Sequence, residues 1–302
     1  MNNPMNLPPL SVSILGVEPL DEFIREIADF VHHMIMTRPN HGPDARVEVE
    51  AKVGILKDKT SNRRLVLPVL VETILAPDAF DVRFETNMSG VSRSLQQSGS
   101  WDSLELQTQH KHYNTLLNEL QGTPRQSQPS NHASPLEYAH LRLVDSFYAS
   151  DNSRDRERIR VTRNEKTGTV LEVMKKIRLG DLNIYCPKRA ADWRVSVNLE
   201  VPVSHPIGSP THTRRKDRMC YSHEEFNIDL TQVVTLTAPN AQPEISHELE
   251  VEIARPALLL YVASKRGDMN APEHERNAFD ELMRSFVNNA RILVKNANDG
   301  WH

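Results

Sequence analysis

The sequence predicts a mainly β protein of the α+β class, a β-barrel or a β-sandwich with a helix near each end. Three observations lead to this prediction. Short runs of alternating apolar and polar residues recur along most of the chain, with turn residues between them, as is typical of barrels and sandwiches. Two stretches near the ends have apolar residues at helical spacing. Two of the alternating runs carry a glutamate at every second residue, which places these acids on one face of a strand.

The predicted elements follow in order along the chain. The first helix is expected at residues 18–36, where acidic residues come early, as a helix N-terminus prefers, and where Pro39 and Gly42 follow the end. The second helix is expected at residues 278–296, with Phe279 and Phe286 on its apolar side. Strands are expected between them at 46–56, 64–75, 80–88, 103–110, 139–149, 156–163, 169–178, 181–186, 193–201, 214–221, 225–236 and 246–254.

The length allows one large domain or two small ones, and no stretch of the sequence marks a clear domain boundary. We expect a single domain over residues 1–302, with a flexible N-terminus at 1–9 and a flexible loop at 121–135, a stretch rich in Gln, Ser and Pro. No apolar run is long enough to span a membrane, and the start of the chain lacks a signal-peptide pattern. The net charge of −4 argues against bulk electrostatic capture of nucleic acid. The two cysteines favour a reducing compartment and a structural role.

The two glutamate ladders indicate a site for a cation. One ladder contains Glu48 and Glu50, and the other contains Glu248, Glu250 and Glu252. The residues between these glutamates are apolar, so each strand has one face for a core and one face of carboxylates. Two like charges about 4 Å apart cost about 4 kcal/mol at an effective dielectric constant of roughly 20. A divalent metal ion with oxygen ligands is the usual way to relieve such repulsion.

The strands between the ladders also have one apolar and one charged face, but their charges are of mixed sign. The charged sets include Arg158 and Arg160, Lys176 and Arg178, Arg194 to Glu200, Arg214 to Arg218, and Asn227 to Thr231. One explanation is that these faces form the solvated surface of a sandwich. The other is a barrel with a polar lumen, in which acids hold a metal ion and bases hold an anion. A metal-bound polyphosphate requires both kinds of residue.

The motifs also resemble those of a known family. The run from Glu48 to Lys52 is similar to the Glu-x-Glu-x-Lys signature of triphosphate tunnel metalloenzymes, and residues 248–252 resemble their last strand. Four segments resemble, in order, motifs of the fungal RNA 5′-triphosphatases, the β subunits of mRNA capping enzymes: 194–202, 214–218, 228–231 and 247–256. The resemblance implies a closed, antiparallel, eight-stranded β-barrel, the triphosphate tunnel, with flanking helices.

The same resemblance implies roles for the acids of the two ladders. Glu48, Glu50 and Glu252 match the residues that bind the catalytic Mg²⁺ or Mn²⁺ in the family. Glu248 and Glu250 match further essential acids, which hold water and orient neighbouring basic groups. These implied roles would place all five glutamates in one catalytic site.

Further residues match the groups that act on water and on the triphosphate. Glu200 matches the acid that positions the attacking water. The matches to catalytic or substrate-binding bases, and to the residues that support them, are Arg160, Lys176, Arg214, Lys216, Arg218, Asp229, Thr231 and Asp145. Asn227 departs from the pattern, since a relative has arginine there, and no phosphate contact is expected from it.

The implied activity is metal-dependent hydrolysis of the γ-phosphate of triphosphate-ended nascent RNA, the first step of mRNA cap formation. The resemblance further implies a homodimer whose interface includes residues 10–35, a nuclear location, and partnership with the capping guanylyltransferase and the transcription machinery. No association with a membrane is expected. Two alternatives stay open: a tunnel hydrolase acting on free nucleotides or inorganic polyphosphate, and a non-enzymatic β-sandwich interaction module.

Overall fold

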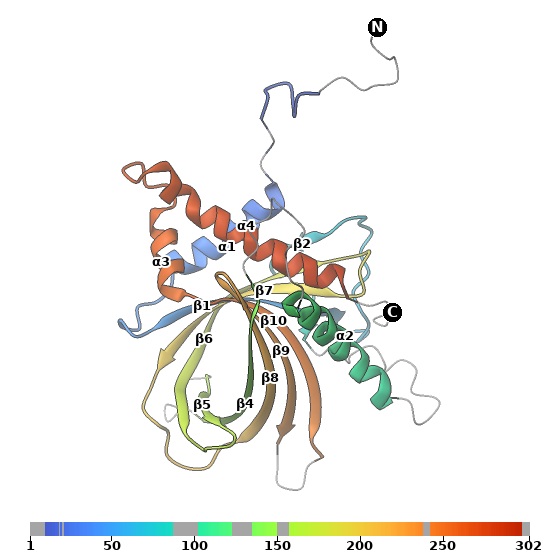
Figure 1. The fold of residues 1–302 in the computed structure, drawn as a ribbon, viewed down its shortest axis with the longest axis vertical. Helices are drawn as coiled ribbons and strands as arrows, with labels where there is room; N and C mark the ends of the chain where they lie inside the picture. The colour runs from blue at the N-terminus through green and yellow to red at the C-terminus, as the bar shows by residue number, and fades with distance from the viewer. Residues whose placement is uncertain are drawn as a thin grey trace.

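The computed structural model describes residues 10–17, 19, 21–86, 102–122, 135–149, 157–237 and 242–297. Helices gather on one side of a large curved sheet (Figure 1). The elements are, in order, α1 (Glu22–Met36), β1 (Arg46–Asp58), β2 (Thr73–Leu75), β3 (Val82–Glu85), α2 (Asp102–Gly122), β4 (Glu137–Tyr148), β5 (Ile159–Asn164), β6 (Val170–Tyr185), β7 (Asp192–Pro202), β8 (His212–His223), β9 (Phe226–Leu236), β10 (Glu244–Ile253), α3 (Pro256–Lys265) and α4 (Glu273–Lys295).

Eight antiparallel strands of the described residues close into a barrel. Their order is β10, β9, β8, β4, β5, β6, β7 and β1, and β1 then pairs back onto β10. Glu50 lies opposite Glu252 across this closing seam. The two short strands are additions, since β3 extends the far half of β1 and β2 pairs with the end of β6. The closed barrel of the sequence prediction is confirmed, and the β-sandwich alternative is wrong.

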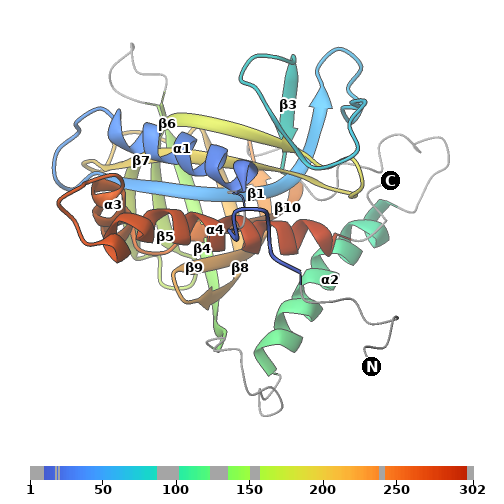
Figure 2. The ribbon, with the colours of Figure 1, turned by 90° about the horizontal axis from the view of Figure 1, so that it is seen from above.

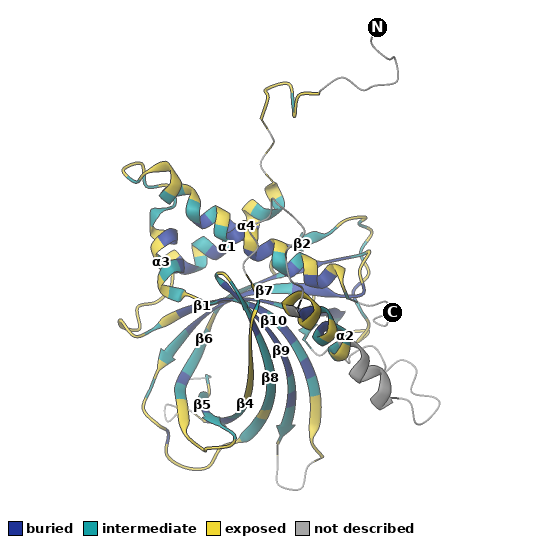
Figure 3. Ribbon diagram, viewed as in Figure 1, coloured by how far each residue is buried: buried dark blue, intermediate teal, exposed yellow. Residues whose placement is uncertain are grey.

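The outer face of the barrel under the helices is the hydrophobic core. Val49 of β1, Val195 of β7 and Val251 of β10 are fully buried there, beneath α1, α3 and α4. Figure 2 shows α1 and α4 lying across β1 and β7, and Figure 3 shows the buried residues concentrated in this layer. The helices therefore fix the three strands that carry both glutamate ladders and Glu200.

Local sequence explains how α1 sits on the sheet. The Asp21 side chain caps the helix by accepting hydrogen bonds from the backbone N–H groups of Phe23 and Ile24. Below the helix, Gly180 lies where β6 has a register shift against β7. A Cβ atom at Gly180 would come within 2.8 Å of the Met34 sulfur, so a larger residue would require the Met34 side chain to shift, and glycine allows α1 to pack closely on β6.

Most predicted elements are confirmed, with four corrections. Residues 103–110, predicted as a strand, belong to helix α2. Of the predicted strand 64–75, only the last three residues form a strand, because Pro68 cannot donate to a ladder. The predicted strands 169–178 and 181–186 are one strand, β6, and helix α3 was not predicted. Residues 1–9 and 123–134 lie outside the described residues, and Gln121 with Gly122 ends α2.

Arg64, which lies outside the regular strands, binds a buried carboxylate. Its guanidinium donates to both carboxylate oxygens of Asp192, with the Nη2–Oδ1 distance at 2.7 Å. Asp192 is fully buried and also accepts the backbone N–H groups of Leu56 and Cys186. This buried cluster ties β1, β6 and β7 together at one end of the barrel.

No helix in the described part of the chain is long and apolar enough to cross a membrane.

Candidate active site in the barrel lumen

The inward-facing side chains line a cavity of about 720 Å³ inside the barrel. Both signs of charge are present in nearly equal number, with eight acids and seven bases. The lining acids are Glu48, Glu50, Asp145, Glu172, Glu200, Glu248, Glu250 and Glu252, and the lining bases are Arg46, Lys52, Arg160, Lys176, Arg214, Lys216 and Arg218. This near balance allows many charges to stay buried together, because most of them have an oppositely charged neighbour.

The three acids predicted as metal ligands lie on the two strands of the closing seam. Glu50 and Glu252 face each other across β1 and β10, and Glu48 follows on the same face of β1. Asn198 of β7, which is 3% exposed, donates from Nδ2 to Glu48 Oε2 at 2.9 Å and to Glu50 Oε1 at 3.1 Å. The Lys176 ammonium pairs with Glu48 and lies 3.3 Å from Glu50 Oε1.

Crowding of negative charge is strongest at Glu252. Burial, together with the carboxylates of Glu48, Asp229, Glu50 and Glu200, raises the pKa of Glu252 to about 8. Burial and neighbouring carboxylates also raise the pKa of Glu50, although Lys52 and Lys176 oppose the shift. A divalent cation bound here would relieve this repulsion.

The donor set fits Mg²⁺ or Mn²⁺, since all three side chains offer carboxylate oxygens, which hard cations prefer. Within the described residues, no three acid, imidazole or thiol side chains stand ready-made in metal-binding arrangement. The present partners of the acids explain this finding, because Glu48 and Glu50 both bind Lys176 and Asn198. A metal ion would have to replace Lys176 as the partner of these two acids.

The other acids of the last strand each hold a base. Glu250 accepts from the Lys52 ammonium at 2.6 Å, and Glu248 accepts from Arg214 Nη2 at 2.5 Å. Although burial alone would raise it, the pKa of Glu250 falls well below its usual range because Lys52 and Arg218 are close. Both acids therefore hold basic side chains of the lumen in place.

A cluster of bases occupies the opposite wall. Lys216 of β8 pairs with the buried Asp145 of β4 at 2.5 Å, and Thr162 donates to the same carboxylate at 2.7 Å. Burial lowers the pKa of Lys216, and the nearby Arg218 and Arg160 lower it further, against the effect of Asp145. A cation surrounded by other cations gains from an anion. These bases are therefore placed to hold phosphate oxygens.

Arg160 connects this wall to Glu200. Its Nη2 donates to Glu200 Oε1 at 2.8 Å and lies 3.9 Å from Glu172, whereas its Nε is buried without a hydrogen-bond partner among the described residues. A buried guanidinium N–H without an acceptor is costly unless a ligand supplies one. The orphaned Nε therefore points to an anionic ligand at this place.

The structure brings the predicted site residues together around one lumen. Asp229 accepts from Arg218 at 2.6 Å and Thr231 accepts from Arg218 Nε at 3.1 Å, so both orient this base. Asn227, opposite Glu252 in register, accepts a hydrogen bond from Ser222 and does not line the cavity.

Sequence reasoning missed several lining residues. The inward-facing residues not predicted for the site include Arg46, Lys52, Phe147, Thr162 and Glu172, together with the buried Asn198. All but Glu172 share a face with a predicted residue two positions away in the same strand, and Glu172 lies four positions from Lys176. The alternation that identified the site could therefore have found them as well.

Comparisons with known proteins agree with this geometry. A profile described as mRNA capping enzyme, beta chain, matches residues 17–299. The mRNA-capping enzyme subunit beta of Schizosaccharomyces pombe is 36% identical over 292 residues, covering 95% of this chain and 85% of that protein. The Cryptococcus neoformans subunit is 32% identical over 295 residues, covering 95% of this chain and 65% of that protein.

A solved structure has the same fold. The S. pombe Pct1 RNA triphosphatase superposes with a TM-score of 0.77 at 33% identity, covering 97% of this chain and 100% of that one. A second structure shows Pct1 in complex with the Spt5 CTD, again with a TM-score of 0.77. The resemblance of the sequence motifs to the fungal RNA 5′-triphosphatases is thus confirmed as a relationship that extends over the whole barrel.

Proposed function

Because the chain belongs to the family of mRNA capping enzyme beta chains, we propose that it removes the γ-phosphate from triphosphate-ended nascent RNA with a divalent metal ion as cofactor. The products are inorganic phosphate and RNA with a 5′-diphosphate end, the substrate of the next step of cap formation. One observation carries the proposal: eight acids and seven bases face each other inside a closed barrel. Such a lumen suits a polyphosphate that arrives with a cation.

The metal ion would be held by Glu48, Glu50 and Glu252. The raised pKa of Glu252 and the facing position of Glu50 support this assignment. When bound, Mg²⁺ or Mn²⁺ supplies positive charge to the phosphoryl oxygens and so stabilises the charge that develops during transfer. Asn198 keeps Glu48 and Glu50 side by side, so both acids can serve one ion.

The bases of the lumen bind the phosphates. Arg160, Lys216 and Arg218 line the cavity and would contact the oxygens of the γ-phosphoryl group. Lys176, which pairs with Glu48, would contact the substrate once the acids hold a cation. Because these side chains are already held by acids such as Asp145, little reorganisation is needed during reaction. Fixed charges in an enclosed site stabilise a transition state better than mobile water does.

Glu200 positions the attacking water. Its carboxylate is fixed by Arg160, the same residue that would contact the γ-phosphate, so the water lies next to the phosphorus. Glu200 orients the water through a hydrogen bond and accepts its proton, and the β-phosphate leaves in line on the far side. No covalent intermediate is required. Burial raises the pKa of Cys186 and of Cys220, the latter to about 12, so neither thiol is a nucleophile.

The remaining proposals concern partners and assembly. The related Pct1 was solved with the Spt5 CTD, which supports recruitment of this chain to the transcription machinery in the nucleus, near the capping guanylyltransferase. A homodimer through residues 10–35 is supported by exposed apolar side chains just before α1, among them Leu10, Ile14 and Leu15. Sedimentation of the intact chain and of Ile14→Ser with Leu15→Ser tests this interface, since the double variant should be monomeric.

Phosphate release from γ-labelled triphosphate RNA in Mg²⁺ or Mn²⁺ tests the activity. Glu48→Ala, Glu50→Ala, Glu252→Ala and Glu200→Ala should each lose most activity while remaining folded. Full activity of the Glu48 and Glu252 variants would contradict the tunnel mechanism. A free-nucleotide hydrolase is the competing enzyme, because the lumen contacts mainly phosphate. Competition between triphosphate RNA and ATP decides between them, and the RNA should win.

A further inference from the structure

An aromatic pair lies at one end of the row of bases that Arg214, Lys216 and Arg218 form along β8. Phe147 of β4 lines the cavity and stacks on His212 of β8, with ring centroids 4.4 Å apart and ring planes within 1° of parallel. The exposed Arg158, which precedes β5, places Nη1 at 3.3 Å from His212 Nδ1. We call Phe147, His212 and Arg158 the aromatic collar. None of the three has a role in the hydrolysis described above.

The register fixes where the aromatic collar lies. Phe147 pairs with His212 on one side and with Arg160 on the other. It comes two residues after Asp145, and His212 comes two residues before Arg214. Two residues of a strand span about 7 Å, so the collar is the next layer of the lumen after the bases.

The collar is at the end of the lumen away from Glu252, one of the proposed metal ligands. Arg218, the most distant of the β8 bases from His212, reaches toward Glu250, whereas Arg214 binds Glu248. Movement along β8 toward His212 therefore leads down the β10 ladder from Glu250 to Glu248 and away from Glu252. A triphosphate whose γ-phosphate lies near Glu252 would direct its α-phosphate and nucleoside toward the collar.

The chemistry of the collar suits a nucleobase. Aromatic rings and guanidinium planes are the surfaces on which proteins stack unpaired RNA bases. Burial and the adjacent Arg158 and Arg214 lower the pKa of His212, which favours the uncharged form of its ring. Phe147 is partly exposed and faces the cavity, which leaves a surface for a base to cover.

We propose that the aromatic collar binds the first nucleotide of triphosphate-ended RNA, with the nucleobase on Phe147 and the RNA chain leaving the barrel through this end. The proposal rests on the function proposed above and adds the direction in which the substrate lies. It also gives RNA an affinity that inorganic tripolyphosphate lacks. The phosphate-binding residues alone provide no such distinction.

Steady-state kinetics with two substrates test the collar. Phe147→Leu keeps an apolar side chain but loses the stacking surface, so it should raise KM for a triphosphate-ended oligoribonucleotide about tenfold, with kcat little changed. KM for inorganic tripolyphosphate should not change. Tyr138→Leu is the matched control, because Tyr138 lies on the same strand and pairs with Tyr221 instead. An equal rise in KM for both substrates, or no rise for RNA, would overturn the proposal.

A photo-crosslink gives the second readout. Triphosphate RNA with 5-iodouridine as its first nucleotide should crosslink to Phe147 or His212, as mapped by mass spectrometry. Crosslinks at Arg46 or Glu172, which lie on other strands of the lumen, would place the nucleoside elsewhere and overturn the inference. If wild type hydrolyses tripolyphosphate but not RNA, the proposed function fails instead. The two failures are therefore distinguishable.

Discussion

The two faces of strand β1 form two buried regions with opposite chemistry. On the outer face, Val47, Val49 and Ala51 are almost fully buried under the helices. On the inner face, Glu48 and Glu50 are also largely enclosed, yet they are charged and held by Lys176, Lys52 and Asn198. The same backbone thus borders an apolar core on one side and a core of ion pairs on the other.

The difference teaches that stability and chemistry are assigned to different faces. The outer core is stabilised by removal of hydrocarbon from water, a non-directional effect that tolerates no charge. The inner core gains little net stability from ion pairs, because desolvation offsets their attraction. Its charges are retained for what they do to a ligand. Variants on the two faces should therefore separate activity from stability.

The largest expected effect is on activity at the inner face. Glu252→Gln keeps the shape of the side chain but removes one predicted metal ligand, so kcat should fall by roughly 10³-fold. The unfolding midpoint should not fall, because a carboxyl whose pKa is raised to about 8 is largely protonated at pH 7, and glutamine has a similar shape and no charge. Glu244→Gln, at the exposed start of the same strand, is the control and should leave kcat unchanged. A stable Glu252→Gln variant with normal kcat would break the comparison.

At the outer core we expect the opposite result, a loss of stability with little change in activity. Phe286 of α4 is fully buried and packs near Phe226 of β9, so Phe286→Ala should lower the free energy of unfolding by about 3–5 kcal/mol. The activity per folded molecule should stay near that of wild type. Denaturant unfolding and kinetics at low temperature measure the two quantities. Arg284→Ala on the exposed side of the helix should change neither.

An intermediate effect is expected where an inner ion pair is broken. Asp145→Ala leaves Lys216 buried beside Arg218 and Arg160, which should cost about 3 kcal/mol of unfolding free energy. Sulfate or tripolyphosphate should restore part of the loss by replacing the missing anion. Arg215→Ala breaks an exposed pair with Glu165 on the outer face of the same strand, and should cost less than about 1 kcal/mol. Equal costs would contradict the distinction between the faces.

The smallest effect concerns pH at the outer face beside α2. Burial, and then His247 at a ring distance of 4.8 Å, lower the pKa of His110 to about 4. In the unfolded chain the pKa of a histidine is about 6.5, so on acidification His110 binds a proton in the unfolded chain before it does in the folded protein. The contribution of His110 to the free energy of unfolding is therefore complete above about pH 6.5 and is lost as the pH falls toward 4. His110→Phe should reduce the fall in unfolding free energy between pH 7 and pH 5. His41→Phe, at an exposed site, should leave that fall unchanged.

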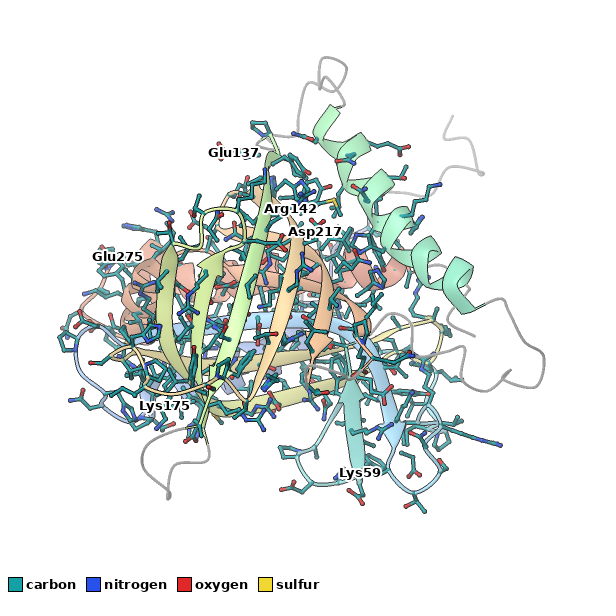
Figure 4. The ribbon with its side chains drawn as sticks, turned by 90° about the horizontal axis from the view of Figure 1, so that it is seen from below. Lys59, Glu137, Arg142, Lys175, Asp217 and Glu275 are labelled. Carbon is teal, nitrogen blue, oxygen red and sulfur yellow. The ribbon has the colours of Figure 1, made fainter. Side chains whose placement is uncertain are left out.

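Ion pairs on the uncovered side of the barrel show why surface charge alone does not define a site. Figure 4 shows Arg142 of β4 and Asp217 of β8 side by side on this face, where both side chains are about half exposed. His140 also pairs with Asp217. These residues repeat the mixed charge seen in the lumen, but water screens them, and no predicted site residue faces this side.

The closed eight-stranded barrel and the roles of the site residues were implied by the resemblance to the fungal RNA 5′-triphosphatases, since alternation alone left a barrel and a sandwich open. Period-two alternation indicated which face of each strand is charged, including the faces of Glu48, Glu200 and Lys216. The same signal fails where it is short: residues 103–110 alternate by chance within the 21-residue helix α2, which is rich in good helix formers. Helix α3 was missed, although Pro256 at its start is a usual signal.

Other features depend on contacts that no local pattern records. Asn198 binds two acids from a neighbouring strand, and its sequence neighbours do not distinguish it from any polar residue on an inward face. The stacking of Phe147 on His212 requires the register of two strands more than sixty residues apart. Such pairings are decided by how the whole barrel closes.

That closure has a consequence for how the protein comes into being. β1 and β10 are joined by about 200 residues, and their pairing sets Glu50 opposite Glu252. A contact of such long sequence separation forms late, since the entropy of closing the loop must first be overcome. When β1 has emerged from the ribosome, only part of the proposed metal site has been made. Until β10 emerges as well, the sheet keeps two unpaired edges. The proposed metal site is therefore complete only after β10 has been made, and a nascent chain that lacks β10 cannot form it.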